Sequence, residues 1–351
     1  MIEKDEIDGI VKGYKDITVA TICSHTALQI FAGAKDEGFR TLGICKPELR
    51  ETYEAFPLAE PDIFLEVADY SDILKKSVQE KLRKENAIVV PHGSFVEYVG
   101  AQDILDNFSV PLFGNRGVLV WESDRKRAEK WLKDAGIRMP KTFADPVDID
   151  RLVMVKFPGA KGGRSYFLAE NQNDFEDGME KSGLTGQDYT IQEYVVGTRF
   201  YPHYFYSPIT DRTELLSMDI RYESNIDGIG RIPHLTEHVD PTFVVTGNLP
   251  VVVRESLIPR ILEMGESVVE VSKKLFAPGI SGPFCIETTC TDKLEFVAFE
   301  ISARIVAGTN LFMQGSPYSQ LIYREPMSTG RRIARELKIA KTKRLLASIV
   351  Y

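Results

Sequence analysis

The chain has 351 residues and a formal net charge of −8, and 43 % of its residues are hydrophobic and 27 % charged. This length is sufficient for two or three domains, each with its own core. The acidic balance argues against a nucleic-acid binder that uses a generally basic surface, so any phosphate site must be local. Neither a signal peptide nor an apolar run of the roughly 18 residues that a membrane span needs is found. We therefore expect a cytoplasmic protein without nucleic-acid or membrane partners.

The N-terminal part alternates between short apolar runs and amphipathic segments. The expected elements are strands at 17–23, 41–45, 62–67, 87–90 and 111–113, and helices at 26–37 and 71–84. This alternation predicts a doubly wound parallel sheet, in which ligands bind beyond the carboxyl ends of the strands. A dinucleotide is not expected, because no G-x-G-x-x-G motif follows the first strand.

Two polar loops follow strands of this predicted sheet. One contains Ser24 and His25, and the other contains His92 and Ser94. The topology predicts that the two loops converge, and a helix that starts near Thr26 offers free N–H groups to an anion. Two alternatives stay open, namely a simple N-cap role for Ser24 and ordinary loop imidazoles for the histidines.

The stretch 153–168 carries the most distinctive local pattern of the chain. An apolar run that ends at Lys156 leads into a glycine-rich loop, which a second apolar run follows. The glycines and cations of the loop are Gly159, Lys161, Gly162, Gly163 and Arg164. Glycines allow close backbone approach to a ligand, and successive N–H groups with nearby cations bind anions. The pattern predicts a phosphate-binding hairpin that closes as a flap over its ligand, with a basic surface hairpin as the alternative.

The rest of the chain is typical of a mixed α+β region. A single helix is expected over 121–136. Strands are expected at 189–197, 200–207, 214–221, 244–248, 282–287 and 296–304, a polar turn at 221–228, and helices at 254–275 and 328–340. The last two strands end near Glu287 and Glu300. Two adjacent carboxylates repel each other unless a divalent cation or an arginine lies between them. If the two carboxylates face the glycine-rich loop described above, this arrangement predicts a nucleotide–Mg²⁺ site. The alternative is a hairpin whose glutamates face solvent.

In order and spacing, several of these residues resemble the motifs of the ATP-grasp superfamily. The matching residues are Lys130, Lys156, Gln192, Glu193, Tyr194, Val195, Glu287, Glu300 and Arg304. The resemblance implies that the two lysines and the glycine loop contact ATP phosphates, that 192–195 bind adenine, and that the two acids hold Mg²⁺. It also implies that Arg304 stabilises an acyl phosphate. Ser302 departs from the asparagine that is usual in this motif, and Asn310 is a nearby substitute.

Over nearly its whole length the sequence resembles the archaeal formate-dependent 5-formaminoimidazole-4-carboxamide ribonucleotide (FAICAR) synthetases. The strings that carry this resemblance include CSHTAL at 23–28, VPHGSF at 90–95, EYVVGT at 193–198 and RYESNIDG at 221–228. It implies that ATP and formate give formyl phosphate, which formylates 5-aminoimidazole-4-carboxamide ribonucleotide (AICAR) in purine (IMP) biosynthesis. By this resemblance His25, Ser94 and Asn248 bind the substrate and Glu223 contacts ATP, with His25 alternatively a proton acceptor. It further implies a homo-oligomer.

Three domains are expected from these observations. They are a Rossmann-like substrate domain at 1–118, an ATP-grasp lid lobe at 119–197, and a C-terminal lobe with the metal site at 198–351. Two other functions stay open: another ATP-grasp carboxylate–amine ligase, and a nucleotide-binding paralogue without turnover, which the departure at Ser302 would suit.

Overall fold

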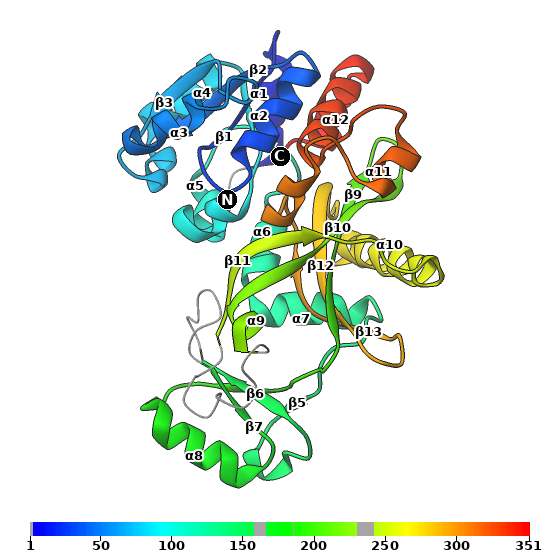
Figure 1. Ribbon diagram of the computed structural model, residues 1–351. Helices are drawn as coiled ribbons and strands as arrows, with labels where there is room; N and C mark the ends of the chain where they lie inside the picture. Colours follow the sequence, from blue (N-terminus) through cyan, green and yellow to red (C-terminus); the bar gives the residue numbers. More distant parts are fainter. Residues whose placement is uncertain (1–2, 158–165, 185, 230–241) are drawn as a thin grey trace.

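The computed structural model describes residues 3–157, 166–184, 186–229 and 242–351. Within these residues the strands form three sheets, one in each of the three expected domains (Figure 1). The domain boundaries themselves stay predictions. No helix of the described part is long and apolar enough to cross a membrane.

The N-terminal sheet is parallel, with the strand order β3-β2-β1-β4. Its strands are β1 (Thr18–Ile22), β2 (Arg40–Cys45), β3 (Ile63–Glu66) and β4 (Ala87–Val89). The helices of this region are α1 (Lys4–Lys12), α2 (Ala27–Asp36), α3 (Arg50–Glu54), α4 (Lys76–Lys84) and α5 (Ala101–Asn107). The predicted parallel α/β sheet is confirmed. Since β1 and β4 are neighbours, the loops that follow them meet at one edge.

Two details of this region differ from the sequence expectation. The helix expected at 71–84 is divided, because Lys75 has an extended backbone between a 3₁₀ turn and α4. The segment 111–113 forms isolated bridges to Val89 and Val350 rather than a regular strand.

The second sheet forms the lower lobe in Figure 1 and has the order β5-β8-β6-β7. Its elements are β5 (Thr142–Phe143), β6 (Val153–Lys156), β7 (Tyr166–Ala169), β8 (Thr190–Glu193) and α8 (Gln172–Ser182). Strands β6 and β7 are antiparallel, with Lys156 opposite Tyr166, as a strand–loop–strand hairpin requires. The intervening glycine loop lies outside the described residues.

The third sheet is antiparallel and lies at the centre of the molecule. Its order is β11-β10-β9-β12-β13. The strands are β9 (Thr198–Ser207), β10 (Arg212–Asn225), β11 (Phe243–Pro250), β12 (Gly282–Cys290) and β13 (Phe296–Ser302). The later helices are α9 (Ile226–Ile229), α10 (Ile258–Leu275), α11 (Pro317–Ile322) and α12 (Thr329–Lys343). The expected turn at 221–228 is wrong for its first half, because pairing with β11 satisfies the backbone of 221–225 despite the polar sequence.

The helix expected over 121–136 is two helices. They are α6 (Gly117–Ser123) and α7 (Arg125–Asp134). Asp124 has an extended backbone, and its side chain accepts hydrogen bonds from the N–H groups of Lys126 and Arg127, so it caps a new helix. This break separates Glu122, in α6, from the face of α7.

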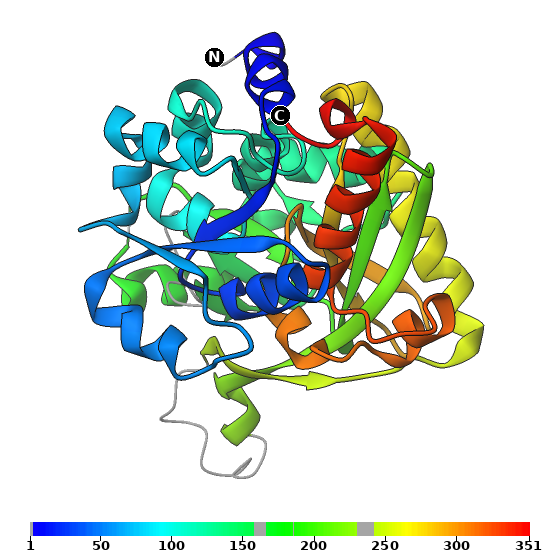
Figure 2. The ribbon, with the colours of Figure 1, turned by 90° about the horizontal axis from the view of Figure 1, so that it is seen from above.

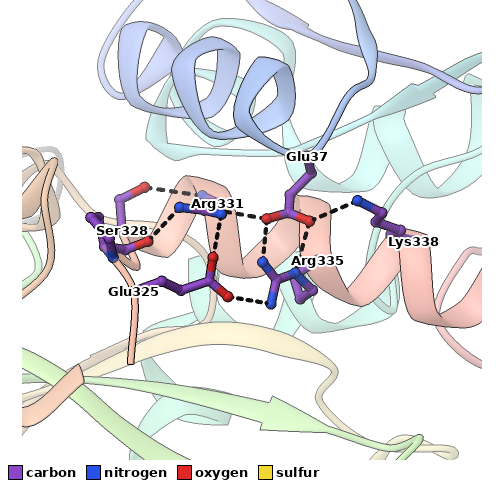
Figure 3. A network of polar contacts seen from close by, with 7 residues as sticks. Glu37, Glu325, Ser328, Arg331, Arg335 and Lys338 are labelled. Atoms are coloured by element: carbon purple, nitrogen blue, oxygen red, sulfur yellow. Dashed lines mark hydrogen bonds and ion pairs between the residues drawn. The ribbon is translucent and has the colours of Figure 1, made fainter. Parts of the chain in front are cut away.

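The C-terminal helix α12 lies beside α2 and joins the N-terminal sheet to the rest of the molecule (Figures 1 and 2). Near this crossing Glu37 is buried and accepts hydrogen bonds from Arg331, Arg335 and Lys338 (Figure 3). Burial alone would raise the pKa of Glu37, but the two arginines outweigh it and lower that pKa to about 2. The network therefore holds the ionised carboxylate of Glu37 between the N-terminal region, which contains α2, and the C-terminal helix α12.

Candidate active site

One face of the central sheet carries a row of charged side chains. Because side chains alternate along a strand, β10 places Asp219, Arg221 and Glu223 toward one side. From β9, Nη1 of Arg199 lies 2.5 and 2.6 Å from the two oxygens of Glu223. The guanidinium of Arg221 stacks 3.8 Å above the centre of the Tyr201 ring. Neighbouring strands thus hold these side chains in fixed positions.

Glu287 and Glu300 lie directly opposite each other on β12 and β13. Both oxygens of Glu287 accept hydrogen bonds from Arg221, at 2.9 and 2.7 Å. The hydroxyl of Ser302 lies 3.4 Å from the same carboxylate. Asn310, the residue suggested as a substitute for the missing asparagine, instead donates to the backbone carbonyl of His25 at 3.1 Å.

The second acid of the pair is held in a repulsive environment. Burial raises the pKa of Glu300 to about 7, and the charge of Glu287 adds to this, while Arg221 and Arg304 act in the opposite direction. The Glu300 side chain remains exposed to solvent, although protein atoms crowd its carboxyl group. Two carboxylates this close favour a proton or a cation between them.

The pair suits Mg²⁺, which takes few carboxylates and completes its shell with phosphate oxygens and water. In the described residues no group of three or more His, Cys, Asp or Glu side chains gathers as a metal site. A cation held by Glu287 and Glu300 would therefore need oxygens from its nucleotide.

Replacing Glu300 with glutamine is expected to stabilise the metal-free protein at about pH 8. When folding raises the pKa of a carboxyl group, the folded protein becomes less stable as the pH rises from the pKa in the unfolded chain to the pKa in the folded protein. For Glu300 these two pKa values are near 4.5 and near 7. Removing the charge should recover on the order of 1 kcal/mol, reduced by solvent screening, and the gain should vanish near pH 4. Urea denaturation at both pH values measures it, with Asp292→Asn in the same hairpin as control. Equal stability of Glu300→Gln and wild type at pH 8 would contradict the repulsion.

Arg304 follows β13, and its partner is Glu122, which was not among the predicted site residues. Nε of Arg304 lies 2.9 Å from Oε1 of Glu122, and Oε2 of Glu122 accepts the N–H of Ala303 at 2.7 Å. The Glu122 carboxylate is buried, which raises its pKa, while the charge of Arg304 lowers it. The available signal was an acid placed directly after the apolar run 117–121. Its partner could not be found from spacing.

The two loops beyond β1 and β4 meet, as their topology requires. The hydroxyl of Ser94 donates to that of Ser24 at 2.9 Å, and the rings of His25 and His92 stack 5.3 Å apart. His92 donates from Nε2 to the last carbonyl of β1 and accepts the N–H of Ser94 at Nδ1, so it is neutral. Ser24 does not cap α2, because the N-cap is Thr26, whose side chain makes no capping bond.

His25 lies where the N-terminal loops approach Arg304. A Cβ atom on Gly93 would stand 2.9 Å from Nε2 of His25 and 3.5 Å from Cζ of Arg304, so glycine permits this approach. Burial lowers the pKa of His25, and the charges of Arg304 and Arg221 lower it further. The imidazole is therefore neutral at physiological pH and can donate or accept a hydrogen bond.

The lid lobe brings a cation to the same face. Nζ of Lys156 donates to Gln192 at 2.6 Å. Burial lowers the pKa of Lys156; the charge of Glu300 raises it, and those of Arg125 and Arg199 lower it. Of the two acids it is thus Glu300 whose charge acts on Lys156. Arg125, which was not among the predicted residues, is a further cation whose charge acts on it.

Lys130 is not placed with this group. It is exposed on α7 and forms an ion pair with Asp134 at 2.6 Å. Asp124 caps α7, so that Arg125 is the first residue of this helix and Lys130 lies in its second turn. Gly159, Gly162 and Gly163 lie outside the described residues.

The remaining predicted residues lie at the end of β8 and on the edge strand β11. The carboxylate of Glu193 accepts the N–H of Lys141 at 2.9 Å, and the N–H of Tyr194 donates to the carbonyl of Leu152 at 2.9 Å. Val195 follows and is half-buried. On β11, Asn248 lies opposite Arg221 in the strand register.

Comparison with known proteins gives full-length matches. A domain of unknown function (DUF1297) matches residues 171–351, and a protein family of unknown function (DUF1246) matches 19–143. A 5-formaminoimidazole-4-carboxamide-1-(beta)-D-ribofuranosyl 5'-monophosphate synthetase of Methanosarcina barkeri is 53 % identical over 354 residues, 97 % of each chain. The protein with the same name in Methanocaldococcus jannaschii is 51 % identical, again over 97 % of each chain.

Solved structures agree with these sequence matches. An IMP biosynthesis protein PurP from Thermococcus kodakaraensis superimposes with a TM-score of 0.77 at 33 % identity, covering 95 % of this chain and 100 % of its own. An N5-carboxyaminoimidazole ribonucleotide synthetase (purK) in complex with ADP gives a TM-score of 0.66 at 11 % identity, covering 92 % of this chain and 76 % of its own, which shows a shared fold alone. The fold is the predicted ATP-grasp architecture, and the chain belongs to the 5-formaminoimidazole-4-carboxamide ribonucleotide synthetase family.

Proposed function

We propose that this protein is a cytoplasmic ligase that formylates AICAR to FAICAR with ATP and formate, giving ADP and phosphate, in IMP biosynthesis. The full-length relatives named as synthetases of this product support the reaction. The single structural observation that carries the proposal is the meeting of Arg304, from the sheet with the acid pair, with His25 from the N-terminal loops. Arg304 therefore lies between the acid pair, where we place the nucleotide, and the N-terminal loops, where we place the ribonucleotide substrate. The homo-oligomer stays a prediction.

The proposed reaction has two steps, the phosphorylation of formate and the transfer of the formyl group to the amine. A formate oxygen attacks the γ-phosphorus of ATP, so that ADP leaves and formyl phosphate forms. The 5-amino group then attacks the formyl carbon, the C–O bond to phosphate breaks, and the nitrogen loses a proton. Hydroxide is a poor leaving group from formate, and phosphate is a good one. Because the amine is conjugated to an electron-poor ring, positioning should supply much of the rate.

On the nucleotide side, Lys156 and Arg125 would bind phosphate oxygens, with Glu223 and the hinge 192–195 around the nucleoside. Glu287 and Glu300 would hold Mg²⁺, which when bound neutralises charge on the transferring phosphoryl group. Arg221 contacts both oxygens of Glu287 in the structure, so it keeps this buried acid paired before the nucleotide arrives.

Between the two sides, Arg304 would stabilise negative charge on formyl phosphate as the amine attacks. His25, with its lowered pKa, suits a neutral hydrogen-bond partner for the ribonucleotide better than a proton acceptor. The departing phosphate is itself basic enough to take the proton of the amine. We therefore assign His25 to substrate binding, together with Ser94 and Asn248.

The purified protein is expected to release ADP at an appreciable rate only with ATP, Mg²⁺, formate and AICAR all present. Mass spectrometry should detect FAICAR, and formate labelled with a heavy oxygen isotope should transfer one label to inorganic phosphate. That transfer distinguishes formyl phosphate from other routes. Absence of FAICAR, with ATP still bound, would favour a nucleotide-binding paralogue, and turnover with another acid or amine would favour a different ligase.

A further inference from the structure

A buried chain of hydrogen bonds leads to one of the proposed substrate-binding residues. The hydroxyl of Ser217 lies 2.8 Å from Nδ1 of His203, and Nε2 of His203 lies 2.8 Å from Oδ1 of Asp219. Nδ2 of Asn248 lies 2.6 Å from the other oxygen, Oδ2. Ser217, His203 and Asp219 are each 1 % exposed, so the serine cannot act as a nucleophile despite the Ser–His–Asp order. The chain is a support for Asn248, which is half-buried.

The chemistry of this chain fixes the direction of the Asn248 amide. An ionised carboxylate only accepts hydrogen bonds, so Asp219 must receive an N–H from His203 and another from Asn248. The NH₂ end of the Asn248 amide therefore points to Asp219. Its carbonyl oxygen points away, and in the described part of the chain no donor meets that oxygen. An amide held in this way presents an acceptor to a ligand.

The surroundings allow little movement of Asp219. A Cβ atom on Gly308 would lie 2.3 Å from Oδ1 of Asp219, so the backbone of the 3₁₀ segment Ala307–Phe312 packs directly against this carboxylate. The same segment carries Asn310, which donates to the carbonyl of His25 at 3.1 Å. One short segment therefore positions two residues. It acts on Asn248 indirectly, through Asp219, and on His25 directly.

We propose that Asp219, held by His203 and Gly308, is a positioning residue that makes Asn248 a selective acceptor for an N–H donor on the base of the ribonucleotide. Ligands that lack this donor, or place an acceptor there, are rejected, because the carbonyl oxygen is left unpaired or repelled. The inference rests on the proposed function, since it takes Asn248 to line the substrate site. It adds that the recognised group is an N–H donor on the base, and that Asp219, His203 and Gly308 orient the acceptor.

Calorimetric binding of three ribonucleotides tests this, namely AICAR, its analogue without the 5-amino group, and its analogue without the carboxamide. We expect wild type to lose about tenfold or more in affinity for the analogue that lacks the recognised donor. In Asn248→Ala and Asp219→Asn that loss should shrink to about threefold or less, because the acceptor is absent or free to turn. ATP binding should be unchanged in both variants, which shows that they are folded.

The outcomes separate this inference from the function on which it rests. If wild type binds AICAR but Asn248→Ala discriminates both analogues as wild type does, Asn248 accepts no donor and the inference is overturned. If Asp219→Asn discriminates like wild type while Asn248→Ala does not, Asp219 sets no direction and its positioning role is overturned. If wild type does not bind AICAR at all, the proposed function fails, and the inference falls with it.

Discussion

Replacing Glu122 with alanine is expected to lower kcat about 100-fold or more, while the KM for ATP changes by about threefold or less. The carboxylate forms an ion pair with Nε of Arg304 and accepts the backbone N–H of the preceding Ala303, so it holds the side chain of Arg304 relative to its own backbone. Without it, Arg304 keeps its charge but loses the direction in which it meets formyl phosphate. Because Glu122 is not among the residues proposed to bind ATP, we expect nucleotide binding to be preserved.

The conservative variant Glu122→Gln separates positioning from folding. Glutamine keeps the volume and an acceptor for Ala303, so it should recover most of the stability but less of kcat. Alanine should also cost on the order of 2 kcal/mol of unfolding free energy, below the range for a fully buried pair because Arg304 retains some solvent contact. Steady-state kinetics and urea denaturation measure the two effects. Wild-type kcat in Glu122→Ala would show that Arg304 does not depend on this partner.

The residues that the sequence could identify are those whose neighbours in the chain carry the signal. Lys156 ends an apolar run before a glycine loop, and Glu287 and Glu300 close two apolar strands, so local patterns were enough to pick them. The loops with His25 and Ser94 followed from parallel-sheet topology. The structure places Glu287 opposite Glu300 and brings the loops with His25 and Ser94 together, whereas the loop after Lys156 lies outside the described residues. The chemical roles of all these residues stay proposals.

Other features were not predicted, either because the residues in contact are far apart in the chain or because a capping residue starts a new helix. Glu122 pairs with Ala303, 181 residues further along the chain, and no local pattern records such a contact. Lys130 was selected by its resemblance to a family motif, on a helix expected to be continuous over 121–136, whereas Asp124 starts a new helix; the role of Lys130 stays a prediction. The polar residues 221–225 were expected in a turn, but cross-strand pairing with β11 holds them in β10. For Glu122 and for residues 221–225, contacts with remote parts of the chain outweighed local preference.

The crossing of α2 and α12 is the place where a single methyl group should disturb both domains. A Cβ atom on Gly33 would lie 2.1 Å from the backbone nitrogen of Arg331, an approach that no side-chain rotation relieves. We expect Gly33→Ala to cost about 3 kcal/mol of unfolding free energy, although alanine favours helix by about 1 kcal/mol. Gly9→Ala in α1 is the matched control, because nothing lies within 4 Å of its added Cβ, and it should stabilise slightly.

The same substitution should also weaken substrate binding, because α2 follows the loop that carries His25. Pushing α2 from α12 would lengthen the hydrogen bonds between Glu37 and Arg335, and would shift His25 relative to Arg304. We expect the Kd for AICAR to rise about tenfold or more in Gly33→Ala and to stay unchanged in Gly9→Ala. The Kd for ATP should change little in either variant, since its proposed contacts lie on the central sheet and the lid. If Gly33→Ala weakened ATP and AICAR equally, the damage would be general unfolding, and the crossing would have no specific part in joining the two halves of the site.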